Sequence, residues 1–181
     1  LISRLTNQKG LDLVNDVIPG VMDGNTQVVV LGTGDSWYEE AFRSYENQYK
    51  GSFCAYIAYD ENVAHNIYSG CDALLVPSRF EPCGLTQLIA MRYGAIPIVR
   101  ETGGLRDTVW PYNMFDNTGN GFTFDRYESG LLYDTINRAK TCYFENRASW
   151  DDMVIRDMNK DVSWETSARQ YKDMYVELTP R

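Results

Sequence analysis

The sequence has few of the residues from which small proteins build metal or disulfide scaffolds. It contains one histidine and four cysteines in 181 residues. The cysteines lie far apart, and no C-x-x-C pair occurs among them. A structural zinc site needs clustered cysteine and histidine ligands, and a disulfide scaffold needs cysteines at a much higher density. We therefore expect neither.

Two further absences limit the kinds of partner. No apolar run approaches the roughly 18 residues of a membrane-spanning helix, and no signal peptide is present, so we expect no membrane partner and a cytoplasmic location. The 17 lysines and arginines do not cluster, and 25 acidic residues outnumber them, giving a formal net charge of -8. Nucleic-acid binders gather basic side chains against the phosphate backbone. We therefore expect no nucleic-acid partner, and an anionic ligand should be small.

What the sequence does contain is ordinary for one globular domain, with 44% hydrophobic and 23% charged residues. Its 181 residues are enough for one packed core and too few for two lobes. The opening residues, Leu1-Ile2-Ser3-Arg4, look like the end of a strand, and no initiator methionine is present. We interpret the chain as a fragment, a single domain covering residues 1–181.

Buried-strand patterns and helical spacing alternate along the chain. The run Val28–Leu31 is apolar throughout, which is typical of a strand buried on both faces of a parallel sheet. The connections are short, so the pattern predicts an α/β fold with a Rossmann-like, doubly wound parallel sheet. Residues 110–121 resemble a surface loop, and a helical segment follows from about 127 to 181. We expect strands at 1–5, 27–31, 52–59, 73–76, 96–100 and 121–124, and helices at 11–22, 37–49, 61–68, from 85 onward, 129–144, 147–159 and 164–178.

The stretch from Leu74 to Val109 carries the clearest functional pattern. A buried strand leads through a loop containing Glu81 into a helix that begins near Gly84. The first amides of a helix lack partners within it and carry partial positive charge, which suits a phosphate, while a carboxylate suits sugar hydroxyls. A second glycine turn, Thr102–Leu105, follows the next strand, and both loops should face one crevice. The alternative is that these loops are simple connectors.

Two cations flank the polar turn after the first strand. Arg4 and Lys9 lie in the string SRLTNQKG. A guanidinium and an ammonium together are suited to the two phosphates of a nucleoside diphosphate, where they would stabilise charge that develops on a departing diphosphate. They could equally be ordinary surface charges, as most lysines and arginines are.

A glycine turn follows the second strand. Gly32-Thr33-Gly34 matches the first part of a dinucleotide fingerprint, but Trp37 stands where the third glycine belongs. We therefore reject a dehydrogenase and retain a glycine turn beside a nucleotide. Tyr59, after the third strand, offers a ring for a nucleobase, although packing is the common role of a tyrosine.

The strings PSRFEPCGLTQLIAMRYG and TGGLRDTV closely resemble the carboxyl-terminal domain of bacterial glycogen synthases and plant starch synthases. These are retaining glucosyltransferases with the two-lobed GT-B fold. The resemblance runs from SRLTNQKG to the closing string DVSWETSARQYKDMY. Many GT-B transferases carry a second glutamate eight positions after the first, where this chain has Ile89. The synthases also tend to be non-acidic there, so this difference points to the synthases among the GT-B transferases.

The resemblance implies a function and a set of site residues. It implies transfer of glucose from ADP-glucose to the non-reducing end of a 1,4-α-glucan, with Glu81, Arg4 and Lys9 as catalytic residues. Glu81 would hold hydroxyls of the donor glucose, and Tyr59 would lie by the adenine. No cofactor or metal is implied, and the absence of a D-x-D pair agrees with that. The donor-binding set implied is Arg4, Lys9, Gly32, Thr33, Gly34, Tyr59, Glu81, Cys83, Gly84, Leu85 and Thr86.

The same resemblance implies that the chain works only as part of a longer protein. The glucan acceptor would bind through an amino-terminal lobe, and closure of the two lobes would complete the active site. We therefore expect the isolated chain to bind ADP weakly and to show no turnover. Two alternatives stay open, namely a related GT-B transferase that uses UDP-glucose and a non-catalytic nucleotide-binding module.

Overall fold

The computed structural model describes residues 1–179, and its centre is a set of short parallel strands. Strands β1 and β2 pair with Val28 opposite Phe53, and β3, β4 and β5 form a second group in that order. The sequence-based α/β prediction is confirmed. The strands are β1 (Val28–Leu31), β2 (Phe53–Tyr56), β3 (Ala73–Val76), β4 (Ile96–Arg100) and β5 (Phe122–Phe124).

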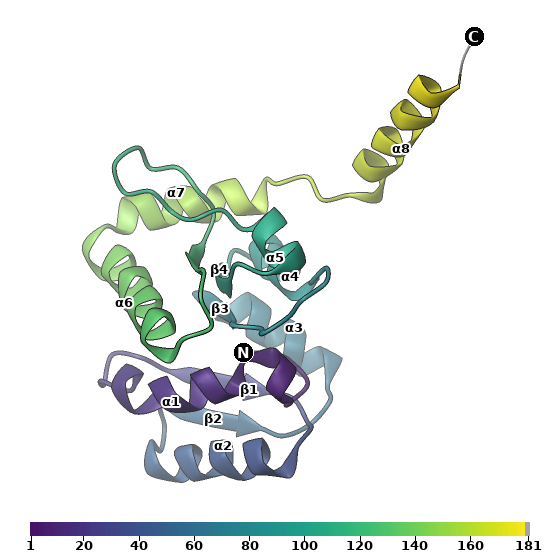
Figure 1. Cartoon of the computed structure of the whole chain (residues 1–181). Coiled ribbons are helices and arrows are strands. Elements are labelled where there is room, and N and C mark those ends of the chain that lie inside the picture. The colour runs from purple at the N-terminus through teal and green to yellow at the C-terminus, as the bar shows by residue number, and fades with distance from the viewer. Residues whose placement is uncertain (180–181) are drawn as a thin grey trace.

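Helices cover both sides of these strands, and α6 (Ser129–Glu145) and α4 (Thr86–Tyr93) lie on opposite sides of β3 and β4 (Figure 1). One core includes Phe42, Phe122 and Trp150, and a second, smaller one lies around Leu74 and Leu105. The helices are η1 (Asn7–Lys9, a 3-10 turn), α1 (Leu11–Val21), α2 (Ser36–Gln48), α3 (Glu61–Gly70), α4 (Thr86–Tyr93), α5 (Gly103–Thr108), α6 (Ser129–Glu145), α7 (Arg147–Met158) and α8 (Trp164–Leu178).

The segment at residues 1–5 differs from the continuous strand expected there. It forms isolated parallel bridges, from Ile2 to Leu31 and from Leu5 to Gly34. Its backbone bonds run to β1 and to the turn after it, for example from the Leu5 amide to the Thr33 carbonyl at 2.9 Å. The segment therefore pairs with β1 along one edge, and the five strands fall into two hydrogen-bonded groups.

Two short elements were absent from the sequence-based prediction. Residues 7–9, expected as a loop, form the turn η1, and residues 103–108, expected as a glycine turn, form α5. Neither is long enough to show a helical apolar period. Helix α1 includes Pro19 and continues to Val21.

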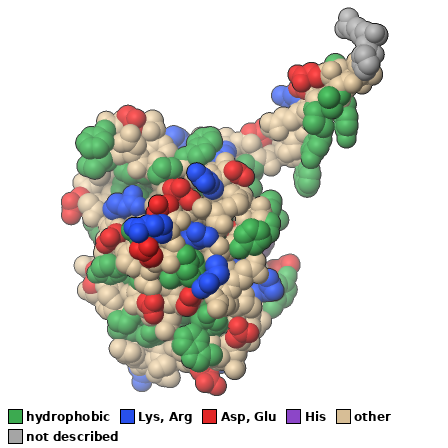
Figure 2. All heavy atoms as spheres, in the orientation of Figure 1, with side chains coloured by type: hydrophobic (Ala, Val, Ile, Leu, Met, Phe, Trp, Pro, Cys, Tyr) green, Lys and Arg blue, Asp and Glu red, His purple; other side chains and the backbone are tan. Residues whose placement is uncertain are grey.

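The closing helix α8 stands away from the rest of the molecule (Figure 1). Ser163 caps its first turn, because the Ser163 hydroxyl accepts a hydrogen bond from the Thr166 amide. No residue of α8 is buried. Figure 2 shows hydrophobic side chains exposed along it, and basic and acidic side chains intermingled on the body. Residues 180 and 181, which end the predicted helical segment, lie outside the described part. Within residues 1–179, none of the helices has the length and apolar character needed to cross a bilayer.

A buried carboxyl lies near the end of α7. Asp157 is 2% exposed, and neither of its carboxylate oxygens has a hydrogen-bond partner within residues 1–179. Burial raises the pKa of Asp157 to about 7, against the opposing charges of Lys160 and Arg156. The folded protein therefore holds a proton here at pH values where the unfolded chain has released it.

This carboxyl should make stability depend on pH. Because its pKa is higher in the folded state, its contribution is complete below about pH 4 and is lost as the pH rises to about 7. The loss is about 1.4 kcal/mol per unit of pKa difference at most. Asp157→Asn should match the wild type in urea unfolding at pH 4 and exceed its free energy of unfolding at pH 8. Asp134→Asn, at an exposed position of α6, is the control. Parallel pH profiles of wild type and Asp157→Asn would contradict this.

Candidate active site

The turn η1 packs against the loop that follows β3. The Gln8 carbonyl accepts from the Arg79 amide at 2.9 Å, and the Gln8 side chain donates to the Phe80 carbonyl at 3.2 Å. Gly10 ends the turn with φ 72°, and a Cβ there would lie 2.0 Å from the Pro77 carbonyl oxygen. The contact therefore requires glycine. It brings together two segments that lie about 70 residues apart in the sequence.

This packing places Lys9 against Glu81. The Lys9 Nζ atom lies 2.6 Å from Glu81 Oε2, and the two side chains are 18% and 13% exposed. Ser78, which is fully buried, donates its hydroxyl to the same carboxylate oxygen at 3.1 Å. Partial burial strengthens such an ion pair relative to one in bulk water. Two of the three predicted catalytic residues are therefore in direct contact.

The third, Arg4, shares a cavity with Lys9. The cavity has a volume of about 160 Å³ and lies between the segment at residues 1–5 and β3. Arg4 is exposed to solvent, and Thr86, the first residue of α4, contributes to the opposite wall. The cavity is lined by Leu1, Ile2, Ser3, Arg4, Lys9, Leu75, Val76, Pro77, Ser78 and Thr86. Two cations and a helix start thus surround one space.

The turn Gly32-Thr33-Gly34 supports the backbone on both sides of Arg4. A Cβ at Gly32 would lie 1.8 Å from the Ser3 carbonyl oxygen, and one at Gly34 would lie 2.2 Å from that of Leu5. Only glycine allows this approach. These glycines allow close packing against the segment that carries Arg4. The carbonyl of the exposed Thr33 accepts a hydrogen bond from the Leu5 amide in that segment.

The start of α4 faces the same space. Gly84 has φ 74°, and the buried Gln87 side chain donates to its carbonyl at 2.9 Å. The helix expected from residue 85 onward begins one residue later, and Leu85 lies outside it. It precedes the helix and is 65% exposed, because the residues of α4 that turn inward are Gln87, Ala90 and Met91.

The second glycine turn holds the Glu81 loop from the other side. The Gly104 amide, in α5, lies 3.1 Å from the Glu81 carbonyl oxygen and 3.2 Å from that of Pro82. A Cβ at Gly104 would lie 1.9 Å from the Cys83 carbonyl oxygen. The Cys83 side chain itself is exposed.

Tyr59 lies apart from these contacts, after the end of β2. Its hydroxyl donates to Glu61 at 2.9 Å, and 84% of its surface is exposed. That hydrogen bond raises the pKa of the phenol. The ring is free to stack with a ligand, and a role in binding the nucleobase stays a prediction.

Two residues of this site were missed in the sequence. Ser78 donates to Glu81, and Arg100, at the end of β4, donates to the Ser78 carbonyl at 3.0 Å. Ser78 lies in the string PSRFEP, but no spacing rule singles out either residue. Within residues 1–179, no group of three or more His, Cys, Asp or Glu side chains is placed to hold a metal ion.

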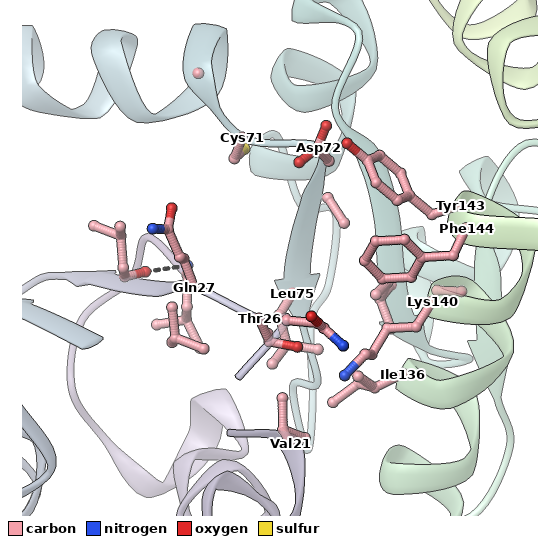
Figure 3. Close-up of a pocket in the computed structure, with 18 of the residues that line it drawn as sticks. Val21, Thr26, Gln27, Cys71, Asp72, Leu75, Ile136, Lys140, Tyr143 and Phe144 are labelled. Atoms are coloured by element: carbon pink, nitrogen blue, oxygen red, sulfur yellow. Dashed lines mark hydrogen bonds between the residues drawn. The ribbon is translucent and has the colours of Figure 1, made fainter. Parts of the chain in front are cut away.

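A second, larger cavity of about 300 Å³ lies at the opposite ends of the strands (Figure 3). It opens beside the first residues of β1 and β3 and beneath α6, from which Ile136, Tyr143 and Phe144 point into it. Lys140 is paired with Asp23 at 2.5 Å. The lining is largely apolar and lacks the converging charges around Lys9, so we place the candidate active site at the carboxyl ends.

The arrangement at the carboxyl ends suits a ligand with an anionic part and a hydroxylated part. Arg4, Lys9 and the amides that begin α4 favour phosphate oxygens. The Glu81 carboxylate accepts hydrogen bonds from hydroxyl groups. Ligands of open α/β sheets usually bind at these strand ends.

Known proteins resemble this chain along most of its length. Residues 1–154 match the family described as glycosyl transferases group 1. A glycogen synthase of Lachnospira eligens is 49% identical over 178 residues, which is 98% of this chain and 37% of that protein. The catalytic domain of starch synthase IV from Arabidopsis thaliana, bound to ADP and acarbose, superposes with a TM-score of 0.87 at 37% identity, over 97% of this chain and 37% of that one.

A third comparison concerns the fold alone. The C-terminal domain of a glycosyl transferase group 1 family protein from Francisella tularensis has a TM-score of 0.66 at 17% identity, over 87% of this chain and 80% of that domain. The resemblance and the fold class inferred from the sequence are confirmed. The chain spans 37% of the length of the glycogen synthase it matches.

Gly104→Ala should disturb this site and the fold together. The added Cβ would meet backbone, which cannot move aside as a flexible side chain does. We expect a loss of more than about 2 kcal/mol in the free energy of unfolding, measured by urea denaturation. Gly130→Ala, in α6, is the matched control because its Cβ would meet nothing within 4 Å. Equal stability of the two variants would show that the loop tolerates the Cβ.

Proposed function

This chain belongs to the glycosyl transferases group 1 family, and on that basis we propose that it is the donor-binding domain of a retaining glucosyltransferase. The donor is ADP-glucose, and the product is a 1,4-α-glucan extended at its non-reducing end. Two relatives support this choice, namely the glycogen synthase that is 49% identical and the starch synthase domain whose structure contains ADP and acarbose.

The observation that supports the proposal most directly is that Glu81, Lys9 and Arg4 lie at one site. Glu81 and Lys9 are in contact at 2.6 Å, and Lys9 lines the same cavity as Arg4 and Thr86. A sugar nucleotide needs a carboxylate near the glucose and cations near the diphosphate. Glu81 supplies the carboxylate, and Lys9 and Arg4 supply the cations.

In this proposal, the partners of Lys9 and Glu81 change when the donor binds. Lys9 turns from Glu81 to the diphosphate, and Arg4 binds the same group from the other side of the cavity. Ser78 stays on Glu81 at 3.1 Å, so the carboxylate keeps one partner while it accepts the glucose hydroxyls. As the bond to glucose breaks, the two cations stabilise the charge that develops on ADP.

The acceptor belongs to the other part of the longer protein. The glucan binds through an amino-terminal lobe, and turnover requires closure of the two lobes. The isolated chain binds nucleotide without turnover. A cytoplasmic location stays a prediction from the sequence.

The diphosphate contacts are tested by calorimetry with ADP. Arg4→Ala and Lys9→Ala should each weaken ADP binding at least tenfold, because a hydrogen bond to a charged group contributes about 1.5–3 kcal/mol. Arg43→Ala, at an exposed position of α2, is the control for loss of one positive charge. Unchanged ADP affinity in both site variants would show that Arg4 and Lys9 do not bind the diphosphate. Stronger binding of UDP than of ADP would point to a uridine donor.

The competition between Glu81 and the diphosphate for Lys9 gives a second test. Glu81→Gln frees Lys9 from its partner, so ADP should bind about fivefold more tightly, which corresponds to roughly 1 kcal/mol for a partly exposed ion pair. Glu101→Gln is the control, because Glu101 is a nearby acid that accepts from Thr123 at 2.7 Å. If Glu81→Gln binds ADP no better than Glu101→Gln does, Lys9 does not exchange partners.

A further inference from the structure

The guanidinium of Arg100 lies behind the loop that carries Glu81. Arg100 ends β4, and its Nε atom donates to the Ser78 carbonyl at 3.0 Å. Its Nη2 donates to the Arg79 carbonyl, and its Nη1 donates to the Asp125 carbonyl at 3.3 Å. One side chain therefore holds two successive peptides of the loop against the segment that follows β5.

Ser78 connects this contact to Glu81. Its carbonyl accepts from Arg100, and its hydroxyl donates to the Glu81 carboxylate at 3.1 Å. Ser78 is fully buried, so it has no room to shift independently of its partners. A displacement of this residue would move the carboxylate. Arg100 thus acts on Glu81 through one intervening residue.

The frame behind Arg100 is rigid. Strand β4 pairs with β3 on one side and with β5 on the other, and Arg100 lies opposite Phe124 in this register. The planar guanidinium presents several donors in a fixed fork, which an ammonium does not reproduce. Removing it would leave the carbonyls of Ser78, Arg79 and Asp125 without this donor. The Ser78 carbonyl is the costly one, because its bond to Arg100 is partly buried and an unpaired buried acceptor destabilises the fold. The loop would then shift to find other partners.

We propose that Arg100 is a positioning residue that fixes the Glu81 carboxylate for the sugar part of the donor, through the backbone and hydroxyl of Ser78. This rests on the proposed function. Arg100 does not contact the nucleotide in this account. Its effect is greatest in the loaded site, because Lys9 has then turned to the diphosphate and Ser78 is the partner that Glu81 keeps.

The neighbouring Arg79 supplies a matched control. Its guanidinium stacks on the Tyr127 ring at 4.3 Å, and that of Arg100 lies 5.6 Å from the same ring. The Arg79 side chain pairs with Asp12 at 3.4 Å and has no bond to Ser78 or Glu81 among the described contacts of residues 1–179. Truncating it removes the same charge at the same ring while leaving the Ser78–Glu81 bond in place.

The test compares ADP and ADP-glucose by calorimetry in the 181-residue chain. In Arg100→Ala, ADP affinity should stay within twofold of wild type, and the ratio of ADP-glucose affinity to ADP affinity should fall about tenfold. Arg100→Lys should recover part of that ratio, and Arg79→Ala should keep all of it. A residue with a purely structural role would change the melting temperature without changing this ratio.

The outcomes separate the two proposals. An unchanged ratio in Arg100→Ala, or an equal fall in Arg79→Ala, overturns the positioning role while leaving ADP binding intact. If wild type binds neither ligand, the proposed function fails, and the positioning role fails with it. If Arg100→Ala does not fold, the ratio in Arg100→Lys decides, since it should lie below that of wild type.

Discussion

The ion pair between Lys9 and Glu81 is the contact on which this site depends. It joins residues 72 positions apart at 2.6 Å, and it forms because several unrelated elements hold one irregular loop. Backbone groups of that loop need partners when they are buried. Gln8 supplies them from η1, Arg100 supplies them from β4, and Gly104 supplies one from α5. Glu81 is therefore fixed by the surrounding frame, and the loop itself contributes little regular structure.

In the proposed function, this pair gives one residue to each part of the donor, Lys9 to the diphosphate and Glu81 to the sugar. Lys9 and Glu81 neutralise each other's charge in this structure, where their charged atoms lie 2.6 Å apart. Under the proposed function, a bound diphosphate would draw Lys9 away and leave Glu81 open to hydroxyl groups. Ser78 keeps the carboxylate from relaxing into solvent. The proposal therefore links binding of the diphosphate to the availability of the Glu81 carboxylate for the glucose hydroxyls.

Sequence alone predicted the parts of this fold that local pattern determines. The buried strands β3 and β4 were found at their observed bounds, because apolar runs between turn residues are a local signal. The turn η1 and helix α5 were missed because they are too short to show a period. That Lys9 and Glu81 belong to one site was expected through family resemblance, but their direct contact was not. Ser78 and Arg100 were not expected either, since their roles arise from contacts between segments distant in sequence.

The most direct test of the account is a crystal structure of the chain with ADP. The account predicts that the Lys9 ammonium and the Arg4 guanidinium both lie within hydrogen-bond distance of diphosphate oxygens. It also predicts that Lys9 has left Glu81, while Ser78 still donates to that carboxylate. A diphosphate bound elsewhere, or bound here with the Lys9–Glu81 pair intact, would contradict it.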